Sequence, residues 1–186
     1  MRVITGIARG TRLKSFEGDN VRPTTDKVKE AIFSSIHFVV EGSKVLDLFA
    51  GTGQLGIEAL SRGANEAFFI DSSKDSIKLV EQNLNLSKLK DSKIKIINED
   101  SILFLKTNTE KFDFVFVDPP YRKGIISQVL ENIENSLNDN AYIFCEHEKE
   151  LELPEKIGNL NLRKTYKYGK IYVSLYRYFC LESDEI

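Results

Sequence analysis

The residues most clearly arranged for chemistry are four consecutive ones, Asp118, Pro119, Pro120 and Tyr121, which follow the apolar run 112–117. The two prolines remove two backbone N–H donors, so the loop offers carbonyls and a carboxylate as hydrogen-bond acceptors. Such a loop suits an amine, for example the exocyclic NH2 of a nucleobase, and Tyr121 supplies a flat face on which the base can stack. We predict that these four residues form a catalytic loop, which we call the acceptor loop.

The chemistry of such an amine defines what the loop must do. The nitrogen is a poor nucleophile because its lone pair is delocalised into the ring. Acceptors that hold both of its hydrogens would turn it out of conjugation, so that the nitrogen could attack a sulfonium methyl group in line. Placing the two reacting atoms about 3–3.5 Å apart would supply most of the acceleration. The target base must be single-stranded or flipped out of a helix.

A second motif, at 47–56, predicts a small-molecule site where a strand meets a helix. Its glycines, Gly51, Gly53 and Gly56, let the backbone turn sharply and approach a ligand closely. The same spacing occurs in nicotinamide dehydrogenases, where a pyrophosphate binds at the helix N-terminus. Asp47 precedes the glycines and would repel a dianionic pyrophosphate, so it favours a ligand with cationic groups, such as a sulfonium and an ammonium.

Two further carboxylates follow the next two predicted strands. Asp71 lies 18 residues beyond Gly53, about where an acidic residue binds ribose hydroxyls. Asp100, followed by Ser101, is placed to accept a hydrogen bond from an adenine amine or to cap a helix before Ile102. Because strand ends converge on one crevice in a parallel sheet, the carboxylates together favour a nucleoside ligand.

Apolar spacing along the chain predicts an α/β domain. The expected strands are 44–49, 67–70, 94–97, 112–117, 141–145, 160–166 and 171–179, and helical spacing marks 28–39, 55–61, 77–84, 102–105 and 125–137. The first five strands alternate with helices, which predicts a Rossmann-like, mostly parallel seven-stranded sheet with helices on both faces. The last two strands flank a turn at 167–170, which predicts an antiparallel C-terminal strand.

The N-terminal part of the chain is basic, although the whole chain has a net charge of −2. We predict a short basic β-hairpin at 1–20, appended to a domain at 21–186, because residues 1–29 hold seven Lys or Arg and three Asp or Glu. The candidate contacts to nucleic-acid phosphates are Arg9, Arg12, Arg22, Arg122 and Lys123, with further cations at 163–170. Solvated surface charge explains such an excess about equally well from charge alone.

The composition limits the number of domains and the class of protein. A chain of 186 residues with 41% apolar residues suffices for one domain. It holds no uncharged apolar run near the roughly 18–20 residues of a membrane span, so we expect a soluble, cytoplasmic protein. Cys145 and Cys180 lie in apolar runs without metal-site spacing, so we expect reduced core residues and no metal.

With these motifs in order, the chain resembles class I methyltransferases that use S-adenosylmethionine. More narrowly it resembles the RsmD family, which methylates N2 of one guanine in the 16S RNA of the small ribosomal subunit. The likeness rests on segments 9–10, 22–30, 47–64 and 117–121 and on Glu146, Glu148, Gly169 and Tyr172. The resemblance implies a monomer whose substrate is 16S rRNA, within the 30S subunit or an assembly intermediate.

Carried over to this sequence, the resemblance implies a role for each motif. Asp47, Gly51 and Gly53 would contact the methionine part of the cofactor, and the catalytic loop would contact the target base. The full predicted site for S-adenosyl-L-methionine is Asp47, Phe49, Gly51, Gly53, Gly56, Asp71, Asp100 and Ser101. The chain departs from the family at Thr52 and Gln54, where smaller residues are commoner, and Asp71 replaces a longer Glu.

Three other functions compete with this interpretation. An adenine-N6 methyltransferase acting on DNA or RNA would use the same acceptor loop, but no region is left for a separate sequence-reading domain. An RNA chaperone that responds to nucleotides would not need Asp118. A nicotinamide dehydrogenase leaves the acceptor loop unexplained.

Overall fold

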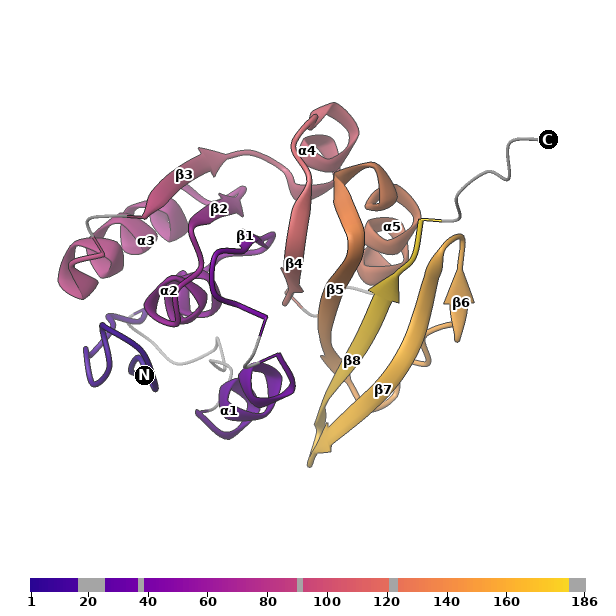
Figure 1. Ribbon diagram of the computed structural model, residues 1–186, viewed down its shortest axis with the longest axis horizontal. Coiled ribbons are helices and arrows are strands. Elements are labelled where there is room, and N and C mark those ends of the chain that lie inside the picture. The colour runs from indigo at the N-terminus through magenta and orange to yellow at the C-terminus, as the bar shows by residue number, and fades with distance from the viewer. Residues whose placement is uncertain (17–25, 37–38, 90–91, 121–123, 181–186) are drawn as a thin grey trace.

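The computed structural model describes residues 1–16, 26–36, 39–89, 92–120 and 124–180 (Figure 1). Four of the predicted site residues, Arg22, Tyr121, Arg122 and Lys123, lie outside these ranges.

The described residues form one eight-stranded sheet with the order β3-β2-β1-β4-β5-β8-β7-β6. The strands are β1 Lys44–Asp47, β2 Glu66–Asp71, β3 Lys93–Asn98, β4 Phe112–Val117, β5 Leu137–Glu148, β6 Lys156–Ile157, β7 Leu160–Tyr168 and β8 Ile171–Tyr178. Strands β1 to β5 pair in parallel, and β8, β7 and β6 continue the sheet in antiparallel fashion. The predicted mostly parallel sheet with an antiparallel C-terminal part is therefore confirmed. The additional strand, β6, has two residues and is too short for any periodic pattern.

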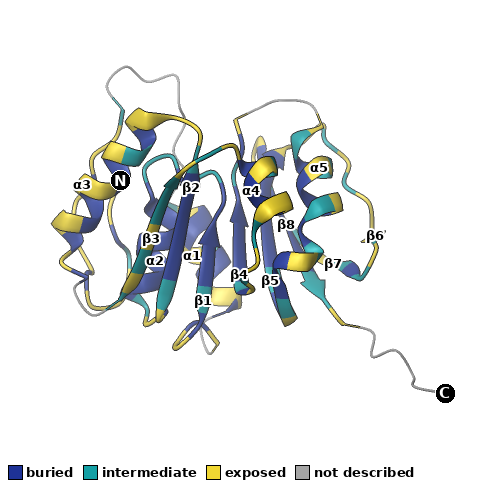
Figure 2. Ribbon diagram, turned by 90° about the horizontal axis from the view of Figure 1, so that it is seen from above, coloured by how far each residue is buried: buried dark blue, intermediate teal, exposed yellow. Residues whose placement is uncertain are grey.

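Helices cover both faces of the sheet, as predicted (Figure 2). They are α1 Asp26–Ser35, α2 Gln54–Ser61, α3 Lys74–Ser87, α4 Ser101–Thr107 and α5 Ile125–Asn132, followed by a 3-10 turn, Glu134–Ser136. One apolar cluster joins α1, α2 and α3 to one sheet face, and a second joins α4 and α5 to the other. No helix in the described ranges is long and apolar enough to cross a membrane.

Three local predictions are wrong. The first helix ends at Ser35, and Val39 lies beyond it with 47% of its surface exposed. Leu137 begins β5 instead of ending α5, because a buried residue after a 3-10 turn satisfies helical spacing equally well. Cys180 is exposed after β8, whereas Cys145 is buried, and burial raises the pKa of its thiol to about 12.

The N-terminal segment, residues 1–16, folds back on itself with a single antiparallel bridge between Arg2 and Arg12. Its apolar side chains Val3, Ala8 and Leu13 are buried in the cluster under α1, α2 and α3. The predicted hairpin is thus reduced to one bridge, and the segment shares the core of the domain.

Glu58 on α2 holds this segment in place. Its carboxylate accepts hydrogen bonds from the backbone N–H groups of Ile4, at 2.7 Å, and Thr5, at 3.0 Å. Lys29 on α1, at 3.5 Å, and Arg62, at 2.9 Å, balance its charge. Burial lowers the pKa of Lys29, while the nearby Glu58 carboxylate opposes that shift. The buried charges are therefore paired and hydrogen-bonded, which makes their burial tolerable.

Candidate active site

Three carboxylates meet at the carboxyl edge of the parallel strands. Asp47 ends β1, Asp71 ends β2, and Asp118 follows β4 directly. Asp47 is in register with Phe69 on β2 and Phe116 on β4, and the other two carboxylates lie two residues beyond these aromatic residues. Because side chains alternate along a strand, all three project toward the face that α1, α2 and α3 cover.

Asp47 is the most buried of the three, with 2% of its surface exposed. Its Oδ2 accepts a hydrogen bond of 2.9 Å from the backbone N–H of Gly56. Burial, with contributions from the negative charges of Asp118 and Asp71, raises the pKa of Asp47 to about 8 against the opposing effect of the Gly56 hydrogen bond. The site therefore disfavours the ionised form of Asp47, and a cationic ligand would favour it.

Asp71 connects the turn that contains Gly51 and Gly53, the glycine loop, to the end of β2. Its Oδ2 accepts from the N–H of Gly51 at 2.9 Å, and its Oδ1 accepts from the N–H of Ser73 at 2.8 Å. The carboxylate is half-buried and fixed in orientation by these two bonds. Each carboxylate oxygen has a further lone pair, so hydroxyl donors of a ribose can still bind.

The glycine loop needs its glycines for different reasons. Gly53 has a φ of 75°, a left-handed conformation that side chains disfavour. A Cβ at Gly56 would lie 2.4 Å from Cε1 of Phe69, so α2 packs directly on β2 at this point. The close packing leaves the start of α2 next to the carboxylates, where a ligand can be approached by backbone groups.

Asp100, Ser101 and Phe49 are more peripheral in the structure. Asp100 is exposed and caps α4, since its Oδ1 accepts from the N–H groups of Ile102 and Leu103 at 3.0 Å each. Ser101 is buried, and its hydroxyl donates to the carbonyl of Leu48 at 2.6 Å, which joins α4 to the end of β1. Phe49 is half-buried against the cluster of α4 and α5. Their contacts to a cofactor stay a prediction.

The acceptor loop begins at this same edge. Asp118 is half-buried, Pro119 is buried and Pro120 is exposed, and the electrostatic effect of Asp118 on Asp47 shows that the two carboxylates are close. Tyr121 lies outside the described residues, so its stacking role stays a prediction. The loop is short, because α5 already begins at Ile125 after Gly124, whose φ is 85°.

Sequence reasoning missed Asn83, which links the glycine loop to the N-terminal segment. Its side chain is fully buried and donates to the carbonyls of Thr52, at 2.8 Å, and Lys14, at 3.1 Å. Its Oδ1 accepts from the N–H of Lys14 at 2.7 Å. A polar residue beside the apolar positions Val80 and Leu84 of α3 was the available signal.

Gln54, the first residue of α2, was noted in the sequence only as a departure from the family. It is 7% exposed, and its Oε1 has no hydrogen-bond partner within the described part of the chain. A buried acceptor without a donor costs free energy. Together with the buried carboxyl group of Asp47, this oxygen fits a ligand that brings cationic or N–H groups to the start of α2.

Comparison with known proteins identifies the family of this chain. The family model described as "Conserved hypothetical protein 95" matches residues 1–177. Ribosomal RNA small subunit methyltransferase D of Escherichia coli (strain K12) is 35% identical over 181 residues, which cover 95% of this chain and 89% of that protein. The chain belongs to the RsmD family. This membership confirms the predicted family and the predicted enzyme class, a methyltransferase.

Other members extend the likeness to the whole length and to the fold. Protein YlbH of Bacillus subtilis (strain 168) is 39% identical over 181 residues, which cover 95% of this chain and 98% of that protein. The solved structure of the Escherichia coli protein yhhF has a TM-score of 0.87 and 33% identity, covering 97% of this chain and 99% of that one. The RsmD-family fold thus includes the N-terminal segment and the C-terminal hairpin of this chain.

Proposed function

We propose that this protein transfers a methyl group from S-adenosylmethionine to the exocyclic N2 amine of a guanine in 16S ribosomal RNA. The observation that carries the proposal is the acceptor loop at Asp118, placed at the same sheet edge as the buried carboxylate of Asp47 and the half-buried carboxylate of Asp71. A relative that is 35% identical over 181 residues is named a ribosomal RNA small subunit methyltransferase, which supports RNA as the substrate.

The residues present fit the cofactor. Asp47, Gly51 and Gly53 would hold its methionine part, where the buried carboxylate favours positive charge. Asp71 would bind the ribose, and Asp100 at the start of α4 would bind the adenine. When bound, S-adenosylmethionine supplies a methyl group made electrophilic by its sulfonium sulfur.

Residues of the acceptor loop would position the base and stabilise the positive charge that develops on its amine nitrogen. The Asp118 carboxylate and the Pro119 carbonyl would accept the two hydrogens of the base amine, which turns its lone pair out of the ring. Buried Pro119 fixes the loop against the sheet, so the acceptors are already oriented before the base arrives. As positive charge develops on the nitrogen, Asp118 stabilises it and takes the departing proton.

Cations of the N-terminal segment and those directly after the acceptor loop would bind phosphates of the RNA. Arg9 and Arg12 are exposed on the N-terminal segment, which Glu58 fixes to α2. Arg22, Arg122 and Lys123, outside the described residues, complete the proposed set. We further propose that the substrate is the 30S subunit or an assembly intermediate, and that the protein acts in the cytoplasm as a monomer.

Two measurements test the function. Mass spectrometry of nucleosides from 16S rRNA should detect N2-methylguanine in cells with this protein and its loss at one position in cells without it. Loss of N6-methyladenine instead would replace guanine by adenine as the target. Calorimetry should show binding of S-adenosylmethionine and no binding of NADH, and the opposite result would refute a methyltransferase.

A further inference from the structure

The hairpin formed by β7 and β8 differs in composition from the rest of the protein. Between Leu160 and Phe179 the chain has five Lys or Arg, no Asp or Glu, and five of its seven Tyr. The cations are Arg163, Lys164, Lys167, Lys170 and Arg177. In a chain with a net charge of −2, this is a strongly basic and aromatic element.

Two of these cations are exposed and are held on tyrosine rings. The Nζ of Lys164 lies 4.7 Å from the centroid of the Tyr166 ring. The Nζ of Lys167 lies 5.4 Å from the centroid of the Tyr172 ring. Cation–π contacts restrict the long side chains, so they lose less conformational entropy when they bind an anion.

The same lysines form no ion pair with a carboxylate of the described residues. Lys44 and Lys95, on the parallel part of the sheet, instead both pair with Glu110. The ammonium groups of Lys164 and Lys167 are therefore not neutralised by a direct ion pair within the described structure, and they can attract a polyanion.

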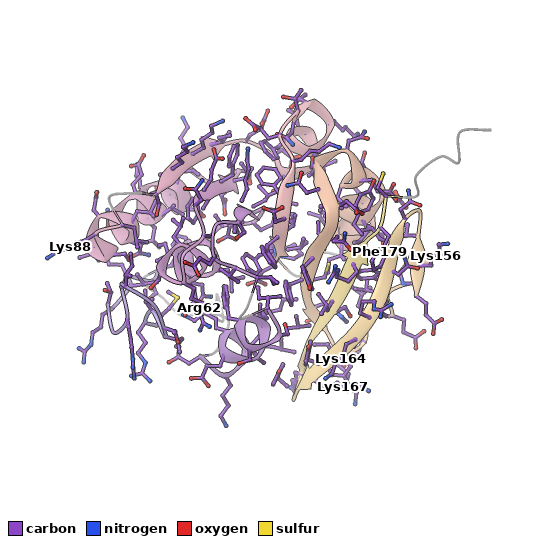
Figure 3. The ribbon with its side chains drawn as sticks, in the orientation of Figure 1. Arg62, Lys88, Lys156, Lys164, Lys167 and Phe179 are labelled. Carbon is purple, nitrogen blue, oxygen red and sulfur yellow. The ribbon has the colours of Figure 1, made fainter. Side chains whose placement is uncertain are left out.

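The hairpin lies close to the acceptor loop. Val117, the residue before Asp118, pairs with Cys145 on β5, and Cys145 pairs with Ser174 on β8. Two strand spacings of about 4.8 Å each therefore separate β4 from β8. The turn between β7 and β8 lies at the carboxyl end of β5, the edge that also carries the acceptor loop. Figure 1 shows the hairpin reaching the level of α1, and Figure 3 shows Lys164 and Lys167 along it.

The two lysine–tyrosine pairs occupy opposite faces of the hairpin. Lys164 and Tyr166 are paired with Leu175 and Val173, whereas Lys167 is paired directly with Tyr172. Side chains alternate along a strand, so the second pair points away from the first. A planar lipid surface could contact one face only, whereas folded RNA can surround a hairpin and contact both.

We propose that the β7–β8 hairpin is a second RNA-contact element, which enters the folded substrate beside the target base. Lys164 and Lys167 bind phosphates on its two sides, and the tyrosines orient these lysines and offer surface to unstacked bases. This inference rests on the proposed function, because it takes RNA as the substrate.

The test removes the two charges and compares a matched control. Lys164→Gln with Lys167→Gln is compared with Lys88→Gln and Lys106→Gln, which remove the same charge from exposed sites elsewhere. Figure 3 shows Lys88 far from the hairpin. Binding to an unmodified 16S rRNA transcript is measured by fluorescence anisotropy over a range of salt concentrations. Thermal unfolding of each variant establishes that it is folded.

The hairpin variant should bind RNA about tenfold more weakly at low salt. Losing two phosphate contacts should also reduce the slope of log affinity against log salt by about 1.4, at roughly 0.7 per contact to single strands. The control should match the wild-type protein, and Lys164→Arg with Lys167→Arg should restore binding. RNA binding by the hairpin variant equal to that of the control would overturn the inference.

The outcomes separate this inference from the proposed function. If the wild-type protein methylates 16S rRNA and the hairpin variant binds like the control, the second contact is refuted and the methyltransferase stands. If RNA binding depends on the hairpin but no methyl group is transferred to the RNA, the contact stands and the proposed function fails. If the two lysines are needed for phosphatidylserine vesicles and not for RNA, the inference is overturned in favour of a lipid surface.

Discussion

The carboxylate cluster of Asp47, Asp71 and Asp118 and the β7–β8 hairpin hold charge in opposite ways. In the cluster, Asp47 is almost completely buried, and Asp71 accepts hydrogen bonds from the backbone N–H groups of Gly51 and Ser73. On the hairpin, Lys164 and Lys167 are exposed and rest on tyrosine rings without a carboxylate partner in the described structure.

This difference explains how one small domain can bind two kinds of ligand. Desolvated, fixed charges interact strongly over short distances and favour a small cationic ligand. Solvated charges are screened by salt and favour an extended polyanion. Substitutions in the carboxylate cluster should therefore alter methyl transfer and stability. Substitutions of the cations on the hairpin and the N-terminal segment should alter RNA affinity and its salt dependence.

The largest effect is expected at Asp118. Asp118→Ala should reduce methyl transfer by roughly 10²–10³-fold, because the amine loses its charged acceptor and the stabilisation of positive charge. Calorimetry should show nearly unchanged affinity for S-adenosylmethionine. The matched control is Glu131→Ala, an exposed carboxylate on α5. Equal turnover in the two variants would remove Asp118 from the mechanism.

The next effect concerns pH and the ligand-free protein. The pKa of Asp47 rises from 3.8 to about 8 on folding, so between these values the folded state holds a proton that the unfolded state has lost. The contribution of this proton to the free energy of unfolding is fully present below pH 4. It is lost as the pH rises toward 8, by up to about 1.4 kcal/mol per pH unit.

Urea unfolding of the wild-type protein and of Asp47→Asn from pH 5 to pH 9 measures this contribution. The asparagine cannot ionise and keeps an oxygen for the Gly56 N–H. The free energy of unfolding of the Asp47→Asn variant should therefore increase relative to that of the wild-type protein as the pH rises. A difference that is constant over this range would show that Asp47 ionises normally.

A smaller effect is expected where α2 meets β2. Alanine normally stabilises a helix interior relative to glycine, but a Cβ at Gly56 would lie 2.4 Å from Cε1 of Phe69. Gly56→Ala should therefore lower the free energy of unfolding by about 1–3 kcal/mol. A double-mutant cycle with Phe69→Leu should show coupling, because the smaller side chain leaves room for the methyl group. Additive effects would contradict the close packing.

The smallest effect is expected at the N-terminal segment. Arg9→Gln with Arg12→Gln should weaken RNA binding at low salt and have little effect at high salt. Arg2 is left unchanged because it pairs with Asp26 at 3.3 Å and its carbonyl accepts a hydrogen bond from Lys29. An unchanged salt profile would make these arginines ordinary surface charges.

Much of the fold could be predicted because its signals are local. The run 112–117 agrees to the residue with β4, since its five apolar residues end one residue before a proline pair that cannot continue a strand. The end of α5 was wrong at Leu137, because a buried residue has the same appearance in a helix and in a strand. Predictions of this kind fail where burial alone sets the pattern.

The candidate site was predicted unevenly for a related reason. Asp47, Asp71 and Asp118 follow strands of a parallel sheet, and strand ends must converge whatever the details of packing. Asp100 and Ser101 also follow a strand, but their hydrogen bonds cap and anchor α4. A side chain that satisfies its own helix start is indistinguishable in sequence from one that binds a ligand.

The elements, their parallel arrangement and the residue types at the strand ends can be predicted from the amino-acid sequence, because each depends on neighbours a few positions apart. The hydrogen bond from the N–H of Ile4 to Glu58, 54 residues away, and those from Asn83 to Thr52 and Lys14 follow instead from the packing of distant segments. The raised pKa of Asp47 has the same origin, since desolvation and the field of neighbouring charges exist only when distant segments pack around one carboxylate.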